Sequence, residues 1–418
     1  MTLRFRGVIF YKAQKAFRNF GTAVMNKIIF TEEFCQPENL FPFTLTRQMQ
    51  DIRVGILTIR EKWEKMLGLP SYDKKEEDYK DLSRSVNVDE ALGARDHCYI
   101  IHGNLLPDAD LVKAVKALKN GEFITGSSGA GLIYRVSRKE VIDRYKIKIG
   151  RSVPYKKTTR HIQYPWDIII HNAWAISQDH KLLKGKRLSQ KISKTNKIIS
   201  PQNLFVEKGV EMEYCIINAT EGPVYIGRNA RIMEGSLIRG PVAIGEEVTV
   251  KMGTRLYGAT SLGPCSVAGG EIKNSVIFGH SNKAHDGYLG DSVIGEWCNL
   301  GAGTSNSNLK NNARPVKVWT PSGELVAGAK CGVMMGDYSR TAINTSINTG
   351  TIIGVCCNVF GNGLTPKYVP NFSWGSEGVR LYDWEKVLED ISGWKQLKGK
   401  KLGEEEKGIL QYIYRKFE

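Results

Sequence analysis

The sequence lacks several features that would narrow its class. No run of eighteen apolar residues occurs among its 418 residues, so no transmembrane helix is predicted. Its eight cysteines are scattered, with no C-x-x-C pair and no Cys/His cluster suited to a metal. We therefore expect reduced thiols, packed as small apolar side chains in a cytoplasmic protein with no membrane partner.

The chain also has fewer acidic than basic residues. It has 59 Lys and Arg against 43 Asp and Glu, and the resulting net charge of +16 favours anionic partners. Residues 181–197 carry seven Lys or Arg and no acid, which is typical of a solvated linker. They have no interleaved aromatics on which bases could stack, so no nucleic-acid partner is predicted.

Residues 1–24 contain five Lys or Arg and no acid, but they lack the apolar region and small-residue cleavage site of a targeting peptide. A fresh methionine, Met25, then leads into an apolar run. The pattern predicts that residues 1–24 are a non-essential basic extension and that Met25 is the functional start.

Residues 25–200 alternate strand-like and helical patterns, which predicts an α/β domain with a mostly parallel, Rossmann-like sheet. Two segments have helical spacing and end in glycine, residues 54–68 and 108–121. Four others resemble strands or strand-to-loop segments: residues 26–30, 97–103, 122–137 and 166–177.

From 205 to 361 the period changes to six. Aliphatic residues recur at every sixth position, namely Ile226, Ile232, Ile238, Ile244, Val250, Leu256 and Leu262. A small or β-branched residue lies four positions after each of them: Ala230, Ser236, Val242, Val248, Thr254, Thr260 and Ser266. This hexapeptide repeat predicts a parallel β-helix, whose aliphatic residues point inward and stack between coils.

Two segments interrupt or follow this repeat. Residues 305–332 break the period with a polar stretch, which is where binding loops commonly leave a solenoid. After 361 the pattern indicates two amphipathic helices, so residues 362–418 are predicted to form a C-terminal helical cap or to pack at a subunit contact.

The stretch KAHDGYLGDSVIGEWCNLGAGT, residues 283–304, carries His285, Tyr288 and Asn299. It resembles the acetyltransferase domain of the GlmU family, which joins N-acetylglucosamine-1-phosphate uridyltransferase and glucosamine-1-phosphate acetyltransferase activities. The family's arginine and lysine fall on Arg255 and Lys273 without gaps. The resemblance covers about residues 220–310 and implies a left-handed β-helix, a homotrimer, and acetyl-CoA and a hexosamine 1-phosphate as substrates.

The resemblance also implies a role for each residue. Histidine titrates near neutrality, so His285 is the expected base for acetyl transfer to an amine. Arg255, Lys273 and Tyr288 are expected to hold the sugar phosphate, and Asn299 the sugar. The remaining expectations are acetyl-CoA contacts at Ala302 and Asn308 and an oxyanion-stabilising backbone amide within residues 301–303.

Downstream the match loosens. The family's N-Y-D-G is replaced by NLKN, residues 308–311. The basic residue expected after it is either Arg314 or Lys317, and the sequence does not choose between them.

The first domain resembles sugar-1-phosphate nucleotidyltransferases through a run of matching positions: Leu40, Pro42, Thr44, Thr46, Arg47, Asp51, Arg53 and Gly55. This resemblance implies a nucleotide site that includes Arg47 and Asn104, with a nucleoside triphosphate as substrate and Mg²⁺ as a second cofactor.

Three departures weaken that second activity. The usual glycine-rich phosphate loop is replaced by FTEEFCQPENL, residues 30–40, with no glycine and three acids. Gln48 and Met49 stand where the family has proline and lysine, and Asn104 stands where a metal-binding aspartate is usual, although Asp108 or Asp110 is placed to compensate.

The sequence thus predicts an α/β nucleotidyltransferase-like domain followed by a left-handed parallel β-helix, acting as a GlmU-like transferase. Acetyl transfer is the leading activity, with nucleotidyl transfer as a second. Two alternatives remain: a nucleotidyltransferase with a structural β-helix, and a non-catalytic scaffold that binds a sugar nucleotide.

Overall fold

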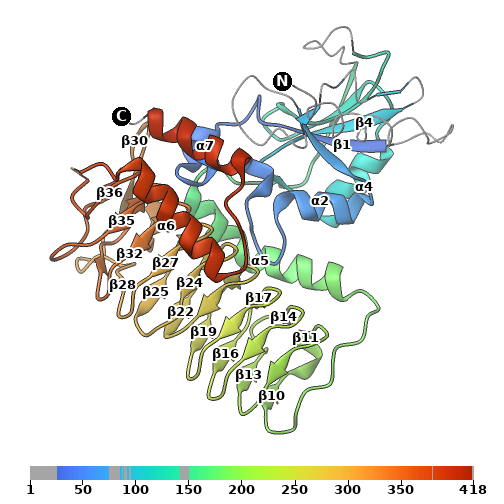
Figure 1. Ribbon diagram of the computed structural model, residues 1–418. Coiled ribbons are helices and arrows are strands. Elements are labelled where there is room, and N and C mark those ends of the chain that lie inside the picture. The colour runs from blue at the N-terminus through green and yellow to red at the C-terminus, as the bar shows by residue number, and fades with distance from the viewer. Residues whose placement is uncertain are drawn as a thin grey trace, which may run out of the picture.

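The computed structural model describes residues 26–74, 85–86, 88, 92–93, 96–141, 150–378 and 380–416. The predicted basic extension and Met25 lie outside these residues. An α/β domain rests on one side of a long β-solenoid, and two C-terminal helices run beside the solenoid (Figure 1). No helix in the described ranges is long and apolar enough to cross a bilayer.

The α/β domain is built on a seven-stranded sheet of order β3-β2-β1-β4-β7-β6-β8, in which only β7 runs antiparallel to its neighbours. Its strands are β1 (Asn26–Thr31), β2 (Ser71–Lys74), β3 (Ser85–Val86), β4 (His97–His102), β6 (Glu122–Thr125), β7 (Gly131–Ser137) and β8 (Arg151–Pro154), and β5 (Leu105–Leu106) pairs separately with β9 (Arg160–His161). Its α-helices are α2 (Ile59–Leu67), α4 (Ala109–Ala117) and α5 (Pro165–Lys184), and short 3₁₀ turns are η1 (Pro37–Leu40), η2 (Phe43–Leu45) and η3 (Met49–Asp51). The predicted, mostly parallel sheet is confirmed.

Helix α5 corrects one prediction, because residues 166–177 were expected to be a strand. Pro165 occupies the first helical position, and the Asp167 carboxylate accepts a hydrogen bond from the Tyr164 backbone N–H at 2.9 Å. Its buried residues recur at helical spacing, including Ile168, Asn172 and Ile176. The apolar run Ile168–Ile170 gave a strand-like pattern locally, but the longer 3.6-residue period decides the structure.

The solenoid is a parallel β-helix with three flat sheets. The first, here called face E, contains β10 (Lys197–Ile199), β13 (Ile216–Asn218), β16 (Leu237–Arg239), β19 (Arg255–Tyr257), β22 (Glu271–Lys273) and β25 (Tyr288–Gly290). The second, face F, contains β11 (Leu204–Val206), β14 (Val224–Ile226), β17 (Val242–Ile244), β20 (Thr260–Leu262), β23 (Val276–Ile277), β26 (Val293–Ile294), β31 (Met334–Met335), β34 (Ile352–Ile353) and β36 (Tyr368–Val369).

The third, face G, contains β12 (Glu211–Met212), β15 (Arg231–Ile232), β18 (Thr249–Val250), β21 (Val267–Ala268), β24 (Asn282–Lys283), β27 (Asn299–Leu300), β32 (Arg340–Thr341) and β35 (Asn358–Val359). The remaining solenoid elements are η4 (Pro201–Asn203), the pair β28 (Ser305–Asn306) and β33 (Ser346–Ile347), and the hairpin β29 (Val316–Thr320) and β30 (Gly323–Gly328). The coils therefore begin and end beyond the expected limits of 205 and 361.

The hexapeptide prediction is confirmed in the core. All seven predicted aliphatic residues are at most 2% exposed, and they pack in one cluster inside the coils. The seven small or β-branched residues are at most 1% exposed. Stacking of like residues between coils thus fixes the register of the parallel strands.

Helices α6 (Trp384–Leu397) and α7 (Glu404–Arg415) lie beside the solenoid, as the red ribbons in Figure 1 show. They pack on the corner between faces F and G, where successive coils place Trp297, Tyr338, Cys356 and Phe372 in the left-handed conformation, with φ between 55° and 61°. Bulky residues rarely adopt that conformation. The helices bury this apolar corner and do not cap the end of the solenoid, which corrects the predicted cap.

Face F is covered by the α/β domain. Its outward residues are largely apolar and form common clusters with the α/β domain, including Phe205, Tyr225 and Ala243 beside Ile176 of α5. The hairpin β29/β30, from the segment expected to be a binding loop, also packs there: Trp319 lies 5.4 Å from Phe41, ring centroid to centroid. The β29/β30 hairpin therefore packs between the solenoid and the α/β domain.

A buried polar contact fixes this docking. The Asn172 side chain, fully buried in α5, accepts hydrogen bonds from the Gly55 N–H at 2.7 Å and from Ser261 Oγ of β20 at 3.0 Å, and donates to the Ala259 carbonyl. Gly55 has φ +81°, and a Cβ there would lie 2.8 Å from the Ala175 backbone. One amide therefore joins the loop after η3, helix α5 and the solenoid.

We expect Asn172→Ala to lower the free energy of unfolding by about 3 kcal/mol, because it leaves the Gly55 N–H and the Ala259 carbonyl buried without a partner. Urea denaturation followed by circular dichroism measures the change. The exposed Asn312→Ala serves as the matched control and should stay within about 0.5 kcal/mol of the wild type. Equal stability of the two variants would contradict the role of Asn172.

Candidate functional site

Face E brings three of the predicted residues into adjacent coils. Arg255 pairs in register with Glu271, and Glu271 with Tyr288, so these three form one outward row. Lys273 lies in the neighbouring row, opposite Tyr257. Because successive coils are separated by one strand spacing of about 4.8 Å, the side chains lie within reach of a single small anion or sugar.

Glu271 links these rows, and the sequence reading did not single it out. Its carboxylate lies 3.5 Å from the Arg255 Nε and accepts a hydrogen bond from the Tyr257 hydroxyl at 2.6 Å. That hydrogen bond raises the pKa of Tyr257 to about 12, and the Lys273 ammonium lies 5.5 Å from the centre of the Tyr257 ring. The sequence indicated that Glu271 lies on the same face as Lys273, because the two residues are two positions apart and side chains alternate between the faces of a strand.

The Tyr288 ring lies across Gly290, two residues further along the same strand. A Cβ on Gly290 would lie 2.2 Å from the Tyr288 hydroxyl oxygen, so glycine makes room for the ring. The hydroxyl accepts a hydrogen bond from Asn308 Nδ2 at 3.0 Å, and Asn308 also donates to Asp291. Asn308 was expected to contact acetyl-CoA; in the folded chain its side-chain amide braces Tyr288 and Asp291.

His285 occupies the corner between faces G and E, with its side chain exposed. The corner is fixed from inside by Lys283, which is 1% exposed and points into the solenoid core. Its ammonium donates to the carbonyls of His285 at 2.5 Å, Asp286 at 3.3 Å and Gly269 at 3.4 Å. Lys283 therefore sets the backbone that carries His285.

The predicted oxyanion segment lies one coil further along the same corner. Gly301 N donates to the Thr341 carbonyl at 3.2 Å, and Gly303 N to the Asp286 carbonyl at 3.1 Å. Among the described residues the Ala302 amide has no such acceptor. Of the three amides, those of Gly301 and Gly303 are thus engaged within the solenoid.

Asn299 lies on face G and not with the face E group. Its carbonyl oxygen accepts a hydrogen bond from Asn282 Nδ2 at 3.3 Å. The Asn282 carbonyl oxygen in turn accepts one from the Lys398 ammonium at 2.9 Å, just beyond α6. Burial lowers the pKa of Lys398 to about 8. Within one chain, Asn299 is therefore separated from the face E group by the corner that carries His285.

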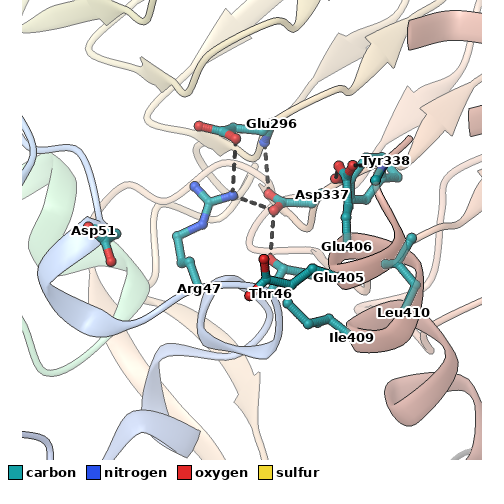
Figure 2. Close-up of a pocket in the computed structure, with 11 residues that line it drawn as sticks. Thr46, Arg47, Asp51, Glu296, Asp337, Tyr338, Glu405, Glu406, Ile409 and Leu410 are labelled. Carbon is teal, nitrogen blue, oxygen red and sulfur yellow. Dashed lines mark hydrogen bonds and ion pairs between the residues drawn. The ribbon is translucent and has the colours of Figure 1, made fainter. Parts of the chain in front are cut away.

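Arg47 lies elsewhere, in the joint between the domains. Its guanidinium donates to Asp337 and lies 3.8 Å from Glu296, while Thr46 Oγ1 donates to Asp337 at 2.6 Å (Figure 2). Burial opposes the charge, but these carboxylates outweigh it and raise the pKa of Arg47. The surrounding cavity of about 390 Å³ is bounded by α7 residues, among them Glu405 and Glu406.

Asn104 lines a different cavity, of about 290 Å³, at the carboxyl ends of β1 and β4. The two residues expected to share one nucleotide site, Arg47 and Asn104, are therefore in separate cavities. The motif around Arg47 has a structural explanation, because its residues bind the solenoid and α5.

Asp108 and Asp110, which were expected to compensate for Asn104 as metal ligands, make other contacts. Asp108 caps α4 by accepting a hydrogen bond from the Leu111 N–H at 2.8 Å and lies 3.7 Å from Arg160. Asp110 pairs with Lys157 at 2.5 Å. Neither lines the Asn104 cavity, and its described lining holds no carboxylate, so these residues do not fit Mg²⁺.

All eight cysteines are free thiols, and six of them are buried. Burial raises the pKa of the Cys298 thiol, which adjoins the His285 motif, well above its ordinary value. Cys298 is thus a packing residue and carries no nucleophilic thiolate.

Comparison with known proteins gives a family match and several relatives. Residues 28–188 match the family model described as sugar nucleotidyl transferase. A bifunctional sugar-1-phosphate nucleotidylyltransferase/acetyltransferase of Sulfurisphaera tokodaii is 32% identical over 229 residues, covering 54% of this chain and 50% of the relative.

Two further relatives match shorter segments. The bifunctional protein GlmU of Methanocaldococcus jannaschii is 40% identical over 87 residues, or 21% of each chain. An uncharacterized acetyltransferase of Escherichia coli, YaiX, is 40% identical over 151 residues, covering 35% of this chain and 66% of the relative. The chain spans about a fifth to two thirds of the relatives it matches. The predicted fold class, a nucleotidyltransferase-like α/β domain followed by a parallel β-helix, is confirmed.

Lys283 makes the stability of the corner depend on pH. Burial lowers its pKa to about 8, below the value of about 10.4 for an unfolded lysine. Between these values the unfolded chain binds more protons, so the contribution of Lys283 to the free energy of unfolding rises with pH. We expect wild type to gain stability relative to Lys283→Met between pH 7.5 and pH 9.5, by about 1 kcal/mol or more, in urea denaturation. Parallel pH profiles would contradict this assignment.

Proposed function

We propose that this chain is a GlmU-like transferase and that its β-helix transfers an acetyl group from acetyl-CoA to a hexosamine 1-phosphate; its similarity to bifunctional sugar-1-phosphate nucleotidyltransferases and acetyltransferases supports the proposal. Glucosamine 1-phosphate is the proposed acceptor. The observation that carries the proposal is the position of His285 at the corner beside Arg255, Lys273 and Tyr288 of face E, one coil from Ala302.

The corner supplies the groups that acetyl transfer needs. The sugar amine attacks the thioester carbonyl, and the His285 imidazole accepts the proton that the amine loses. The carbonyl oxygen becomes an oxyanion in the tetrahedral intermediate, where the Ala302 N–H donates to it. The intermediate then expels the coenzyme A thiolate, which takes up a proton, and the amide product forms. No covalent acyl-enzyme is required.

Face E supplies the binding energy for the acceptor. Arg255 offers a planar pair of donors and Lys273 a point charge for the phosphate, while Tyr288 is oriented by Asn308. Glu271 separates these cations and keeps Arg255 extended along the row. The carboxylate also suits the amino group of the sugar.

The acetyl-CoA site is proposed to lie along the corner between faces G and E. Small residues follow one another there, with Gly269 and Gly270 one coil before His285 and Ala302 one coil after it. A Cβ on Gly269 would lie 2.3 Å from the Ala284 carbonyl, so a larger residue does not fit between these coils. No bulky side chain therefore covers the outer surface of the corner at Gly269, and we propose that the ligand binds there. Lys398 places a positive charge beside Asn299 at the other edge of face G, where a coenzyme phosphate binds.

We propose a homotrimer of this chain. Face E and the earlier coils of face G are open, whereas face F is covered by the α/β domain and α6 packs on Arg340 of face G. Face E also exposes Ile199, Ile216 and Leu237 in coils next to Arg255, with 40%, 46% and 46% of their surface accessible. A second copy packed on this strip encloses the His285 corner and brings an Asn299 to it. The free thiols fit a reducing compartment, and we place the protein in the cytoplasm.

The rival functions differ in what they release. A nucleotidyltransferase with a structural solenoid releases pyrophosphate from a nucleoside triphosphate and no thiol from acetyl-CoA. A scaffold that binds a sugar nucleotide releases neither. The geometry of the His285 corner favours the acetyltransferase over both.

His285→Ala is expected to reduce thiol release from acetyl-CoA and glucosamine 1-phosphate by about a hundredfold or more, because no other described side chain replaces the base. A thiol-reactive dye measures the release. His171→Ala, on α5 and far from the corner in sequence and fold, is the matched control and should retain full activity. Unchanged release from the His285 variant would refute the catalytic assignment.

Arg255→Gln should raise the KM for the sugar phosphate about tenfold or more while changing kcat less, since it removes a charged contact made in the ground state and in the transition state alike. Arg239→Gln, one coil earlier on the same face and paired with Glu221, is the control. Steady-state kinetics with varied sugar phosphate separates the two constants. A fall in kcat at constant KM would place Arg255 outside the phosphate site.

A further inference from the structure

The C-terminal end of helix α6 reaches the polar row on face G that carries Asn299. Asn282 and Asn299 stand opposite each other in the adjacent strands β24 and β27. The Lys398 ammonium donates to the Asn282 Oδ1 at 2.9 Å and to the Cys265 carbonyl at 2.8 Å. Asn282 Nδ2 in turn donates to Asn299 Oδ1 at 3.3 Å. Three side chains are thus joined in series, from the C-terminal helices to the residue proposed to hold the sugar.

The direction of these hydrogen bonds is set by Lys398. An ammonium has three donors and no acceptor, so Asn282 must turn its carbonyl oxygen toward it. The amino group of Asn282 then faces Asn299, which must accept with its own carbonyl oxygen. In the reverse orientation an amide N–H would face the ammonium, and a charge-assisted hydrogen bond would be lost. One donor-only group therefore determines how two amides are turned.

Asn299 is left with its amino group as the part that a ligand meets. Within the part of the chain that the structure describes, the Asn299 Nδ2 makes no hydrogen bond, and the residue is half-buried. The next residue of the row, Arg340, carries donors only, and its guanidinium lies 5.6 Å from the centre of the Trp394 ring on α6. Neither Arg340 nor the amino group of Asn282 can accept a hydrogen bond from Asn299.

The position of Lys398 is itself fixed by the packing of α6. Lys395, one turn earlier, is 6% exposed and donates to Glu406 of α7 at 2.5 Å. Its ammonium lies 4.3 Å from the centre of the Trp297 ring. Both helices bury the apolar cluster that includes Trp297, two residues before Asn299. The end of α6 therefore cannot leave face G without exposing this cluster.

We propose that Lys398 is a positioning residue for the acceptor sugar, because it turns Asn282 and Asn299 so that Asn299 presents an N–H donor to a hydroxyl oxygen of the hexosamine. The inference rests on the proposed acetyl transfer. A protonated amine has no acceptor and cannot take the place facing Asn299, so the sugar is oriented with a hydroxyl there and its amine toward His285. The third N–H of Lys398 stays available for the coenzyme phosphate.

The test compares substitutions that differ in what they offer to Asn282. Lys398→Arg keeps a donor-only cation, Lys398→Met offers no polar group, and Lys398→Glu offers only acceptors. Asn282→Asp leaves Lys398 in place but offers Asn299 an acceptor, so that Asn299 turns its carbonyl oxygen outward. Lys401→Met, at an exposed position three residues further on, is the matched control. Thiol release is measured with varied glucosamine 1-phosphate and with varied acetyl-CoA.

We expect kcat/KM for glucosamine 1-phosphate to stay within about twofold of wild type in Lys398→Arg and Lys401→Met, and to fall about fivefold in Lys398→Met. It should fall about tenfold or more in Lys398→Glu and in Asn282→Asp, which both reverse the amide of Asn299. Asn282→Asp should leave the KM for acetyl-CoA unchanged, because Lys398 remains. Equal losses in Lys398→Met and Lys398→Glu, or full activity of Asn282→Asp, would overturn the proposal.

Urea denaturation shows whether each variant is folded, and Asn282→Asp carries the test if Lys398→Glu is not. Failure of the proposed acetyl transfer has a different signature, since wild type and all variants would then release no thiol. In that event a double-mutant cycle of Lys398→Met and Asn282→Leu still tests the contact. We expect the double variant to shift the urea midpoint by less than the sum of the single variants. Additive shifts would show that Lys398 does not act through Asn282.

Discussion

Burial of face F against the α/β domain is the constraint on which the rest of the structure depends. Apolar residues point outward as well as inward along that face, so the solenoid cannot stand alone in water there. Asn172 adds direction to this apolar contact, because its amide is satisfied only when helix α5, the loop at Gly55 and the coil at Ala259 meet in one register. The domains therefore behave as one packed unit with a common core.

With face F occupied, chemistry is left to faces E and G and to the corner between them. The predicted residues divide accordingly, with Arg255, Lys273 and Tyr288 on face E, Asn299 on face G, and His285 at the corner. The corner owes its shape to a lysine buried inside the solenoid and to glycines that let neighbouring coils approach. A solenoid of this kind presents rigid rows of side chains, while enclosing them requires a second surface. That geometric need supports assembly of several copies.

In the α/β domain, part of the run that matches the nucleotidyltransferases joins the two domains. Thr46 and Arg47 bind Asp337 of the solenoid, and Gly55 packs on α5. The crevice at the carboxyl ends of β1 and β4 is a separate cavity, and its described lining includes Asn104 and Gln163. The matching run and the crevice therefore lie in different structural environments.

The sequence by itself determined the β-helix, because an inward aliphatic residue every six positions satisfies no other regular backbone. The residues of face E and His285 were singled out by the resemblance to the GlmU family. The sequence also carried unused signals, such as Glu271 two residues before Lys273. The helix at residues 166–177 was also readable from the sequence, through Pro165 and the 3.6-residue spacing of its buried side chains. Only the tertiary structure decided that α6 and α7 cover an apolar corner and that Arg47 pairs with Asp337 across the domains. These two outcomes depend on contacts between segments distant in sequence, and the local period does not specify which partner a side chain will meet.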